Sequence, residues 1–359
     1  MLGAVMSLSN KAPPPLVSFI LVAYNQEKFI EEAVRAALRQ TYEPLEIIIS
    51  DDASTDRTFE IAKAVAGQYE GSHRVTVRRN AKNMGINPHI NWVVNEAKGE
   101  FIIAAAGDDI SLPERTEELV RYWQAGASGV FSNASLIDAQ GNSRGLFVRA
   151  GYRHKRDWRT MALDGTHGAW GCSFAWEKRV FDIFGDMPEN ILGEDAVIPF
   201  RCALLKGVAY VDEPLVQYRD HGGNVSFWAQ EEHSSKEAMV QLGSRIMQFK
   251  ERMYDNWRHD LDLACDKGWI SEQERQWGQR VLTENTLQAR KMDSMLRSGF
   301  SALIVLLPVF GVYFAGRMSR LAPVHDVLRK TAWTLLNGVL HYRAPRLHQQ
   351  IRRALGRNT

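Results

Sequence analysis

The sequence is poor in the residues and motifs that define several common protein classes. Its 359 residues include only three cysteines, and no two of them form a CxxC spacing. This scarcity argues against a disulfide framework and a cysteine-rich zinc site, and it favours a reducing, cytosolic environment. The sequence also contains no GxGxxG, GxxxxGK(S/T) or GxSxG motif. Those absences count against dinucleotide-binding, P-loop and α/β-hydrolase chemistry.

Long apolar runs are also scarce. The segment from Phe300 to Gly316 is uncharged over 17 residues and contains Pro308, whereas a helix needs about 20 apolar residues to cross a bilayer. Residues 299–359 carry nine Lys or Arg and a single acid, Asp326, although the whole chain has a net charge of only +2. An apolar and basic region of this kind predicts contact with an anionic membrane surface, and a buried helical hairpin is the alternative.

Four expected strands alternate with amphipathic segments in the first 110 residues. They are Val17–Ala23, Glu46–Ser50, Val75–Arg79 and Phe101–Ala106. The apolar runs of the first and the last are typical of strands in the interior of a parallel sheet. Between the first two of these strands, apolar residues recur at helical spacing, and we expect Asn25 to be the N-cap of a helix over 27–40. The alternation predicts an α/β fold with a doubly wound, mainly parallel sheet.

Adjacent acidic residues follow two of these expected strands. Asp51 and Asp52 open the stretch DDASTD, and Asp108 and Asp109 follow Gly107 directly after the 101–106 run. Ligands of open α/β sheets bind at the carboxyl ends of the strands. Neighbouring carboxylates repel each other unless a cation holds them, and divalent metals with oxygen ligands are the usual solution. For each motif alone, a turn at 107–109 and helix capping at 51–56 are the simpler alternatives.

The later sequence is less regular. Glu194 and Asp195 follow a glycine and precede an apolar helix, where acids also compensate a helix dipole. The stretch YRDHGGNVS contains Arg219 and His221, a cation and an imidazole suited to phosphate or metal, although a single histidine is more often structural. We expect a short strand over 208–211 and long helices over 230–257 and 271–296. Ser271 and Glu274 are spaced as a capping box for the second long helix.

Taken together, these motifs resemble glycosyltransferase family 2, which has the GT-A fold. VSFILVAYN resembles the family's opening strand and nucleotide-contacting loop, and EIIISDDASTDRT resembles its acidic second loop. NMGINPHIN resembles the Asn-x-Gly stretch, and AAAGDDISLP resembles the metal-binding Asp-x-Asp region. GED resembles the acidic motif that supplies the base, and YRDHGGNVS resembles the closing loop. The resemblance covers about residues 16–226 and implies a Rossmann-like mixed, mainly parallel sheet with flanking helices.

The resemblance also implies a set of site residues. The donor nucleotide would be contacted by Ala23, Tyr24, Asn25, Asp51, Asp52, Asn83, Gly85, Asp108, Arg219 and His221, with Asp51 or Asp52 on the base and Arg219 and His221 near the diphosphate or metal. Asp108 and Asp109 would bind Mg²⁺ or Mn²⁺. Asp195 would deprotonate an acceptor hydroxyl for in-line attack with inversion, and Glu194 would help to place the acceptor.

Two positions depart from the family pattern. Many members carry Asp-x-Asp-Asp, but Ala106 stands at the first Asp, so metal ligation would rest on one carboxylate plus waters. Ile90 replaces an arginine that is often found in the third motif. The QxxRW motif of processive synthases is absent, which favours an enzyme that adds a single sugar.

The expected organisation is a lead-in over 1–15, a GT-A domain over 16–228, a helical extension over 229–298 and a membrane-associating region over 299–359. Such a region predicts docking on the cytoplasmic face of the inner membrane, and hence a lipid acceptor. We expect a polyprenyl-diphosphate-linked saccharide, as in O-antigen and other surface polysaccharides. Transfer to polyprenyl phosphate, and a degenerate sugar-nucleotide-binding scaffold favoured by Ala106, are the alternatives. No nucleic-acid partner is expected, and the sequence leaves the sugar, nucleotide and oligomeric state open.

Overall fold

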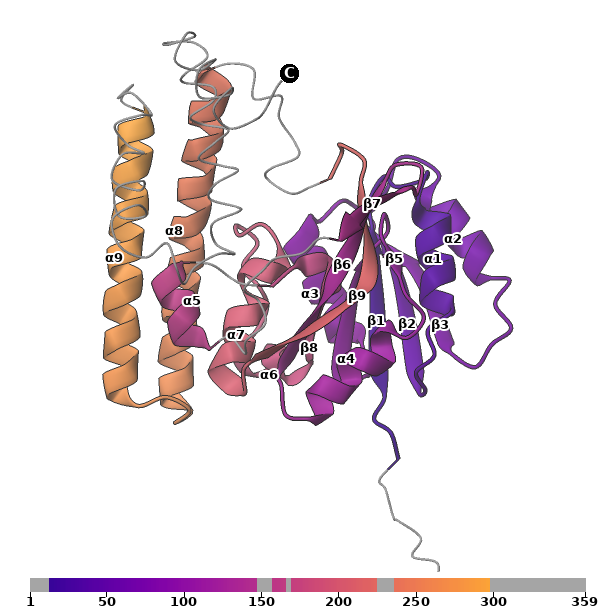
Figure 1. Ribbon diagram of the computed structural model, residues 1–359, viewed down its shortest axis with the longest axis horizontal. Coiled ribbons are helices and arrows are strands. Elements are labelled where there is room, and N and C mark those ends of the chain that lie inside the picture. The colour runs from indigo at the N-terminus through magenta and orange to yellow at the C-terminus, as the bar shows by residue number, and fades with distance from the viewer. Residues whose placement is uncertain (1–12, 147–156, 166–168, 225–235, 298–359) are drawn as a thin grey trace, which may run out of the picture.

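The computed structural model describes residues 13–146, 157–165, 169–224 and 236–297. They form a sheet with helices on both faces and a pair of long helices packed beside it (Figure 1). The expected α/β class with flanking helices is therefore confirmed.

The first half of the sheet is built from alternating strands and helices, as the sequence predicts. The strands are β1 (Val17–Ala23), β2 (Leu45–Asp51), β3 (Arg74–Arg79) and β4 (Phe101–Ala106), and the helices are α1 (Ile30–Leu38), α2 (Thr58–Ala66) and α3 (Ile86–Glu96). β2 is buried along its whole length, and β1 and β4 are buried at all but one residue each. Their near-continuous apolar runs are thus those of interior strands.

The second half is less regular and contains several short elements. Its strands are β5 (Ile110–Ser111), β6 (Gly129–Asp138), β7 (Ser143–Leu146), β8 (Phe174–Glu177) and β9 (Val208–Asp220). Its helices are α4 (Arg115–Gln124), α5 (Trp158–Asp164), α6 (Arg179–Phe184), α7 (Ile198–Leu205), α8 (Lys236–Asp266) and α9 (Glu272–Arg297), with single 3₁₀ turns at Gly171–Ser173 and Glu194–Ala196. β9 is far longer than the expected strand over 208–211, and this extension carries Arg219.

The strand order sets the position of the site. It runs β3-β2-β1-β4-β8-β6-β9-β5, with β7 paired to β6. β3, β2, β1 and β4 are parallel, whereas β8 is antiparallel to both β4 and β6. The chain moves outward from β1 to β3 and then returns to β4, so a topological switch point lies between β1 and β4. Ligands of such sheets bind in the crevice at the carboxyl ends of the strands at that point.

The core lies on both faces of the sheet. On one face, β1 residues Phe19 and Leu21 pack with apolar residues of α1, α2 and α4. On the other face, Ile20 packs with α3, α6 and α7, and this cluster continues into α8 and α9. The two long helices therefore share a core with the sheet and are not a separately folded unit.

Trp257 of α8 is the main contact between the long helices and the sheet domain. Its ring stacks on Phe200 of α7 with centroids 4.4 Å apart, and its indole N–H donates to the Ala196 carbonyl at 2.8 Å. Arg201 and Asp260 form a buried ion pair at 3.1 Å in the same contact. The capping box at the start of α9 is confirmed, because Ser271 and Glu274 exchange hydrogen bonds.

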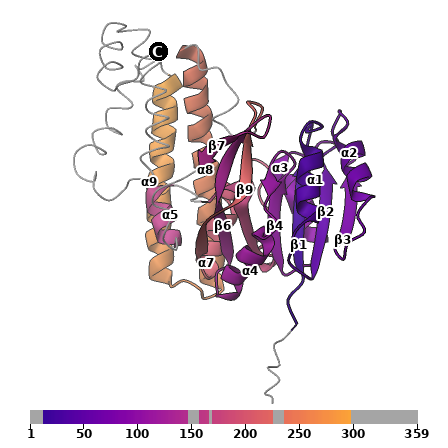
Figure 2. The ribbon, with the colours of Figure 1, turned by 45° about the vertical axis from the view of Figure 1, so that its right-hand side comes forward.

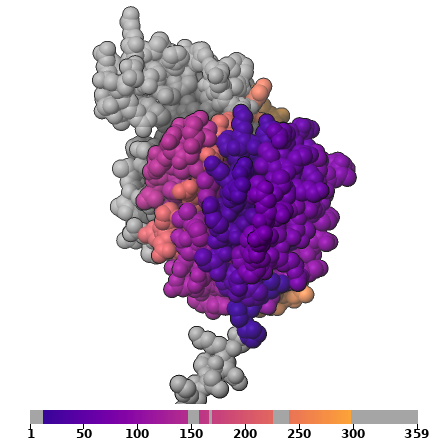
Figure 3. Space-filling model, turned by 90° about the vertical axis from the view of Figure 1, so that its right-hand side faces the viewer, coloured from indigo at the N-terminus to yellow at the C-terminus, as the bar shows by residue number. Residues whose placement is uncertain are grey.

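The long helices stand at one end of the sheet, and both of their free ends lie on the side of the site. Figure 2 shows α8 and α9 beside the sheet. In Figure 3 the N-terminal half fills the front of the molecule, and the two long helices show only at its margins. In Figure 1 the start of α8 and the end of α9 lie on the same side as the carboxyl ends of the parallel strands. No helix in the described part of the chain is long and apolar enough to span a bilayer. The apolar run 300–316 lies outside the described residues.

Candidate active site

The loops after β1 and β2 are fastened to each other at the carboxyl edge of the sheet. Asn25 and Ala53 both have positive φ, 53° and 59°. Non-glycine residues adopt this conformation at a cost of about 1–3 kcal/mol, and they keep it where neighbours fix them. The Asn25 N–H donates to Ser54 Oγ at 2.8 Å, and Asn25 Oδ1 accepts the Thr55 N–H at 2.8 Å. The expectation that Asn25 caps α1 is wrong, because its side chain bonds this neighbouring loop and α1 begins only at Ile30.

Asp52 holds the Asn-x-Gly stretch that leads into α3. Its Oδ1 accepts from Asn80 Nδ2 at 2.6 Å and from the Met84 N–H at 2.9 Å. Its Oδ2 accepts the Gly85 N–H at 2.9 Å, and Asn83 Oδ1 accepts the same N–H. Gly85 has φ 81°, which explains why glycine stands at this position. Both carboxylate oxygens of Asp52 are therefore engaged by the loop.

Asp51 is left with one free carboxylate oxygen. Its Oδ2 accepts the Ser54 N–H at 2.9 Å and lies 3.3 Å from Arg79 Nε. Its Oδ1 is buried and has no hydrogen-bond partner. Beside it, Ala23 is buried and accepts the Asp52 N–H through its carbonyl, whereas Tyr24 is 43% exposed. Of the two adjacent acids, only Asp51 has a carboxylate oxygen that accepts no hydrogen bond from the protein.

The turn after β4 carries Asp108 and Asp109, which differ in their surroundings. Asp109 is buried, and its Oδ1 accepts the Arg219 N–H at 2.9 Å. Burial, and next the charge of Asp108, raise the pKa of Asp109 well above its ordinary value. Asp108 instead faces His221, with Oδ2 and Nε2 3.1 Å apart. The His221 ring packs on Phe29, the residue before α1, at a centroid distance of 4.8 Å.

Asp108 and His221 are the pair best placed to hold a metal ion. Their side chains are 13% and 15% exposed, so both remain accessible at the edge of the sheet. A carboxylate oxygen and an imidazole nitrogen suit Mn²⁺ and, less well, Mg²⁺. Among the described residues, no group of three or more potential ligands gathers into a complete metal site. Any cation held here would therefore need oxygens from a ligand or from water.

Arg219 lies inside the structure and not at the surface of the crevice. Its side chain is 2% exposed, and its guanidinium donates to the carbonyls of Asp108, Asp138 and Ala139 and to Glu32. The guanidinium carbon lies 5.0 Å from the centre of the Phe29 ring. The described contacts of Arg219 are thus all with the protein.

Glu194 and Asp195 lie in the 3₁₀ turn that follows Gly193, whose φ is 90°. Burial, and next the charge of Asp195, raise the pKa of Glu194 to about 7. A Cβ on Gly171 would lie 2.1 Å from Glu194 Oε1, so this glycine allows the close approach of the 171–173 turn. Trp257 supports the turn from behind through the Ala196 carbonyl.

Two asparagines of α3 hold the segment that leads into this acidic turn. Asn91 Nδ2 donates to the Met187 carbonyl, and Asn91 Oδ1 accepts the Met187 N–H, each at 2.9 Å. Asn87 Nδ2 donates to the carbonyls of Pro188 and Ile191 at 2.9 and 2.6 Å. Side-chain amides therefore satisfy the backbone of a segment that has no strand partner.

Cys172 marks where the acidic groups of distant segments meet. Burial raises the pKa of its thiol well above the ordinary value, and the charges of Asp109, Glu194 and Asp195 raise it further. The opposing charge comes from Arg115, which is fully buried and donates to the Ala104 carbonyl at 2.7 Å. Neither residue was expected at the site, because nothing in their sequence neighbourhood distinguishes them.

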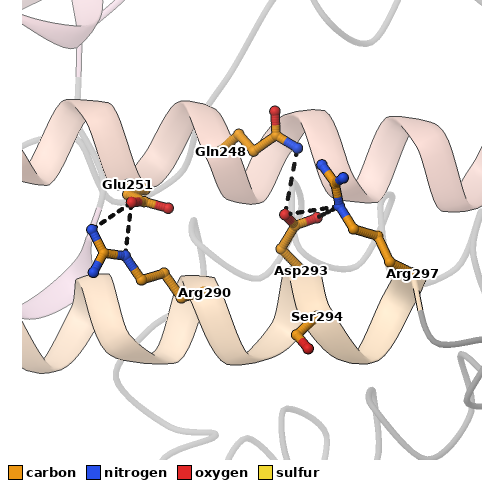
Figure 4. Close-up of a pocket in the computed structure, with 6 residues that line it drawn as sticks. All are labelled: Gln248, Glu251, Arg290, Asp293, Ser294 and Arg297. Carbon is orange, nitrogen blue, oxygen red and sulfur yellow. Dashed lines mark hydrogen bonds and ion pairs between the residues drawn. The ribbon is translucent and has the colours of Figure 1, made fainter.

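The structure thus brings most of the expected residues to one edge of the sheet. Ala23 pairs with Asp51 and Val22 pairs with Ala106, so the acidic loops after β2 and β4 flank the loop after β1. A separate groove of about 650 Å³ lies between α8 and α9 (Figure 4). Its charged side chains pair with each other, as Arg290 with Glu251 and Arg297 with Asp293, and none belongs to the acidic edge.

The sheet order and the acids at the carboxyl edge of the sheet define a GT-A-like α/β domain, as the sequence led us to expect. Residues 18–182 match the family model described as glycosyl transferase family 2. Residues 18–182 therefore form a glycosyl transferase family 2 domain, and the resemblance of the motifs to this family is confirmed over that range.

Relatives match parts of the chain. EpsE of Bacillus subtilis, which is named as a glycosyltransferase, is 38% identical over 108 residues, covering 30% of this chain and 38% of EpsE. An uncharacterized glycosyltransferase of Nostoc sp. is 26% identical over 236 residues, covering 63% of this chain and 71% of that protein. The chain therefore spans well under two thirds of EpsE.

Two solved structures are similar at low sequence identity. One is Staphylococcus aureus TarS in complex with UDP-GlcNAc, with a TM-score of 0.49, 15% identity, and coverage of 79% of this chain and 92% of that one. The other is the mannosyltransferase PcManGT of Pyrobaculum calidifontis with GDP-Man and Mn²⁺, with a TM-score of 0.49, 14% identity, and coverage of 92% and 88%. These are distant likenesses, and the sheet order and the family match define the fold.

Proposed function

We propose that the protein is an inverting glycosyltransferase that moves a sugar from a nucleotide-sugar donor to an acceptor hydroxyl. The observation that carries the proposal is that the 171–173 turn lies against Glu194 at Gly171, while Cys172 of the same turn feels the charges of both Asp109 and Glu194. The acids of 107–109 would face the donor diphosphate and those of 193–195 the acceptor. Asp195 would take the hydroxyl proton as the acceptor oxygen bonds to the anomeric carbon. The bond from that carbon to the diphosphate breaks, and its electron pair leaves with the nucleoside diphosphate.

Asp108 and His221 would hold the divalent cation, Mg²⁺ or Mn²⁺. Their facing atoms lie 3.1 Å apart, which supports the assignment, and Asp109 fits less well because its Oδ1 already accepts the Arg219 N–H. When bound, the cation would neutralise charge that develops on the leaving diphosphate. Ala106 supplies no carboxylate at the position where many family members carry one, so only one acid would bind the metal directly.

Asp51 would recognise the nucleotide base. Its unpartnered Oδ1 supports this assignment over Asp52, whose oxygens are both engaged by the 80–85 loop. Tyr24 and Asn25 would line the same pocket, and Asn83 and Gly85 would form its far wall. Glu194 would place the acceptor beside Asp195. Its pKa of about 7 allows its carboxyl group both to donate and to accept a hydrogen bond near neutral pH.

A donor screen on the full chain tests the proposal. UDP-, GDP- and dTDP-sugars would be compared by thermal shift and by hydrolysis, with Mn²⁺, with Mg²⁺ and with EDTA. We expect one nucleotide class to bind only with the metal, and to do so more weakly in Asp108→Asn. Absence of any metal-dependent binding across the panel would contradict the assignment of the crevice to a donor.

The acceptor would be a polyprenyl-diphosphate-linked saccharide at the cytoplasmic face of the membrane. Support comes from the sequence after α9, which is apolar and then basic, and from the end of α9 on the side of the crevice (Figure 1). Sedimentation of the full chain with vesicles tests this. We expect binding to phosphatidylglycerol vesicles that exceeds binding to phosphatidylcholine and weakens in an R329E/K330E variant. Equal partitioning in all three cases would contradict it.

Two alternatives make different predictions. Direct transfer to polyprenyl phosphate would give product with that lipid and none with a diphosphate-linked saccharide. A degenerate scaffold, which Ala106 favours, would bind a sugar nucleotide without turnover on any lipid acceptor. Acceptor assays with both lipids, using the donor found in the screen, separate the three cases.

A further inference from the structure

We infer that Arg219 is a positioning residue, which fixes the Asp108–Asp109 turn and the His221 loop while making no contact with the donor. The inference rests on the proposed function, since the turn matters as the place where donor and cation would bind. It replaces the expectation that this arginine contacts the diphosphate.

The contacts of Arg219 on the turn are the first argument. Its backbone N–H donates to Asp109 Oδ1 at 2.9 Å, and its side-chain Nε–H donates to the Asp108 carbonyl at 3.0 Å. One residue of β9 therefore fixes both acids of a turn that lies about 110 residues earlier in the chain. A guanidinium can do this because its donors have a rigid planar arrangement, which the single ammonium of lysine lacks.

The remaining donors connect the turn to two other segments. Nη1 donates to the carbonyls of Asp138 and Ala139, at the end of β6, at 3.4 and 3.3 Å. Nη2 donates to Glu32 of α1, which is 59% exposed on the surface. With these partners satisfied and 2% of the side chain exposed, the guanidinium has no face turned toward a ligand.

Arg219 also holds His221 opposite Asp108. Its carbonyl accepts from Asn224 Nδ2 at 2.8 Å, and Asn224 Oδ1 accepts the His221 N–H at 3.2 Å. The Phe29 ring contacts both side chains, with its centroid 5.0 Å from the Arg219 guanidinium carbon and 4.8 Å from the centroid of the His221 ring. The arginine thus sets the positions of both residues of the proposed cation pair. Outer partners of this kind typically change metal affinity by about 10–100-fold when removed.

Arg219→Lys separates a positioning role from a direct contact, because lysine keeps the positive charge and lacks the planar set of guanidinium donors. The matched control is Glu32→Gln, which removes the charge of the surface partner and leaves the bond to the Asp108 carbonyl. Hydrogen–deuterium exchange of the metal-free full chain would be followed in peptides covering 107–112. Peptides covering 45–66, which Arg219 does not touch, serve as the internal reference. We expect exchange at 107–112 to be about 10-fold faster in Arg219→Lys and unchanged in Glu32→Gln, with the reference unchanged in both.

Binding of Mn²⁺ alone, followed by electron paramagnetic resonance, gives the second readout. We expect about 10-fold weaker binding in Arg219→Lys, and near-complete loss in Asp108→Asn. Unchanged exchange at 107–112, or equally faster exchange in the reference peptides, would overturn the inference. If Arg219→Lys leaves exchange at 107–112 unchanged but weakens the binding of UDP or GDP, Arg219 contacts the diphosphate directly and the inference is also overturned. If the wild-type chain binds no Mn²⁺, the proposed cation site fails, and the exchange data still decide the role of Arg219.

Discussion

The proposed donor side and the proposed acceptor side of the site are held in different ways. On the donor side, Asp52 and Asn25 bond to loops that follow neighbouring parallel strands, within about 33 residues along the chain. On the proposed acceptor side, the segment around the 193–195 turn is held at Met187 by Asn91, 96 residues earlier, and at Ala196 by Trp257, 61 residues later. The donor side is thus a product of the repeating α/β units. The acceptor side is assembled from α3 and α8 and has no regular strand of its own.

This difference separates the consequences of substitution. Changes on the donor side act on atoms that touch the ligand or on the loop beside it. Changes on the acceptor side can act through helices that touch no substrate, because the turn has few other supports. Substitutions on the two sides test this difference, and their expected effects decrease in the order given.

Asp195→Asn is expected to have the largest effect. Loss of a general base lowers kcat by about 10²–10⁴-fold, and the amide occupies nearly the same volume, so the fold should persist. Steady-state transfer assays with the donor and acceptor found above would measure it. A kcat within about threefold of wild type would remove Asp195 from the role of base.

Asn91→Ala is expected to lower kcat by about 10–100-fold. Without Asn91 the segment before the acidic turn can shift, and a displacement of the general base by about 1 Å can reduce the rate by about 100-fold. The Km for the donor should stay unchanged, since Asn91 contacts only the 187 backbone. Asn95→Ala is the matched control: it lies one turn later on α3 and bonds the exposed Asp186 side chain. Equal kcat values for the two variants would show that α3 does not support the acidic turn.

Asp51→Asn and Asp52→Asn should have separate effects on the donor side. The first removes the free acceptor oxygen and should weaken nucleoside diphosphate binding by about 10-fold, the effect of about 1.4 kcal/mol. The second weakens charge-assisted bonds to the 80–85 loop, worth about 1.5–3 kcal/mol each, and should lower Tm more than Asp51→Asn does. Calorimetric titration and thermal melts distinguish them. Weaker binding confined to Asp52→Asn would assign the base to Asp52.

Glu194→Gln should show a small, pH-dependent gain in stability. The folded pKa of Glu194 is about 7 and its ordinary value is 4.5, so the folded protein retains a proton that the unfolded chain releases. Stability therefore falls as pH rises from 4.5 to 7, and glutamine escapes this loss. At pH 8 we expect the Tm of the variant to exceed that of the wild type by about 2–4 °C for each kcal/mol of difference in unfolding free energy. At pH 4.5 the excess should be smaller. Glu189→Gln, at an exposed position nearby, should show no such trend.

The first half of the fold could be predicted because its signals are local. Interior parallel strands such as β1 and β4 read as apolar runs, and the acids that follow β2 and β4 in sequence also follow them in space. β1, β2, β4 and the edge strand β3 were predicted within about one residue at each end. The same local logic misplaced Asn25, since its contacts come from the loop after β2 and not from its own helix.

The second half could not be predicted because tertiary contacts decide it. β9 extends to Asp220 although it contains Pro214 and charged residues, because it pairs with β6 and β5 across an irregular register. Burial of the Arg219 side chain depends on three separate segments, 29–32, 108–109 and 138–139, and such a residue reads in sequence as a surface cation. Cys172 and Trp257 likewise reach the site only through packing. The roles of individual acids therefore stay predictions, and the apolar run 300–316 lies outside the described residues.

The most direct test of the account is a comparison of donor binding by Asp108→Asn and Asp195→Asn. Titration calorimetry with the donor identified above and Mn²⁺ would measure both variants against wild type. The account predicts that Asp108→Asn binds the donor at least about 100-fold more weakly, because several kcal/mol of charge stabilisation is lost. It predicts that Asp195→Asn binds the donor with wild-type affinity. An equal loss of affinity in both variants would place Asp195 on the donor side and contradict the division of the crevice.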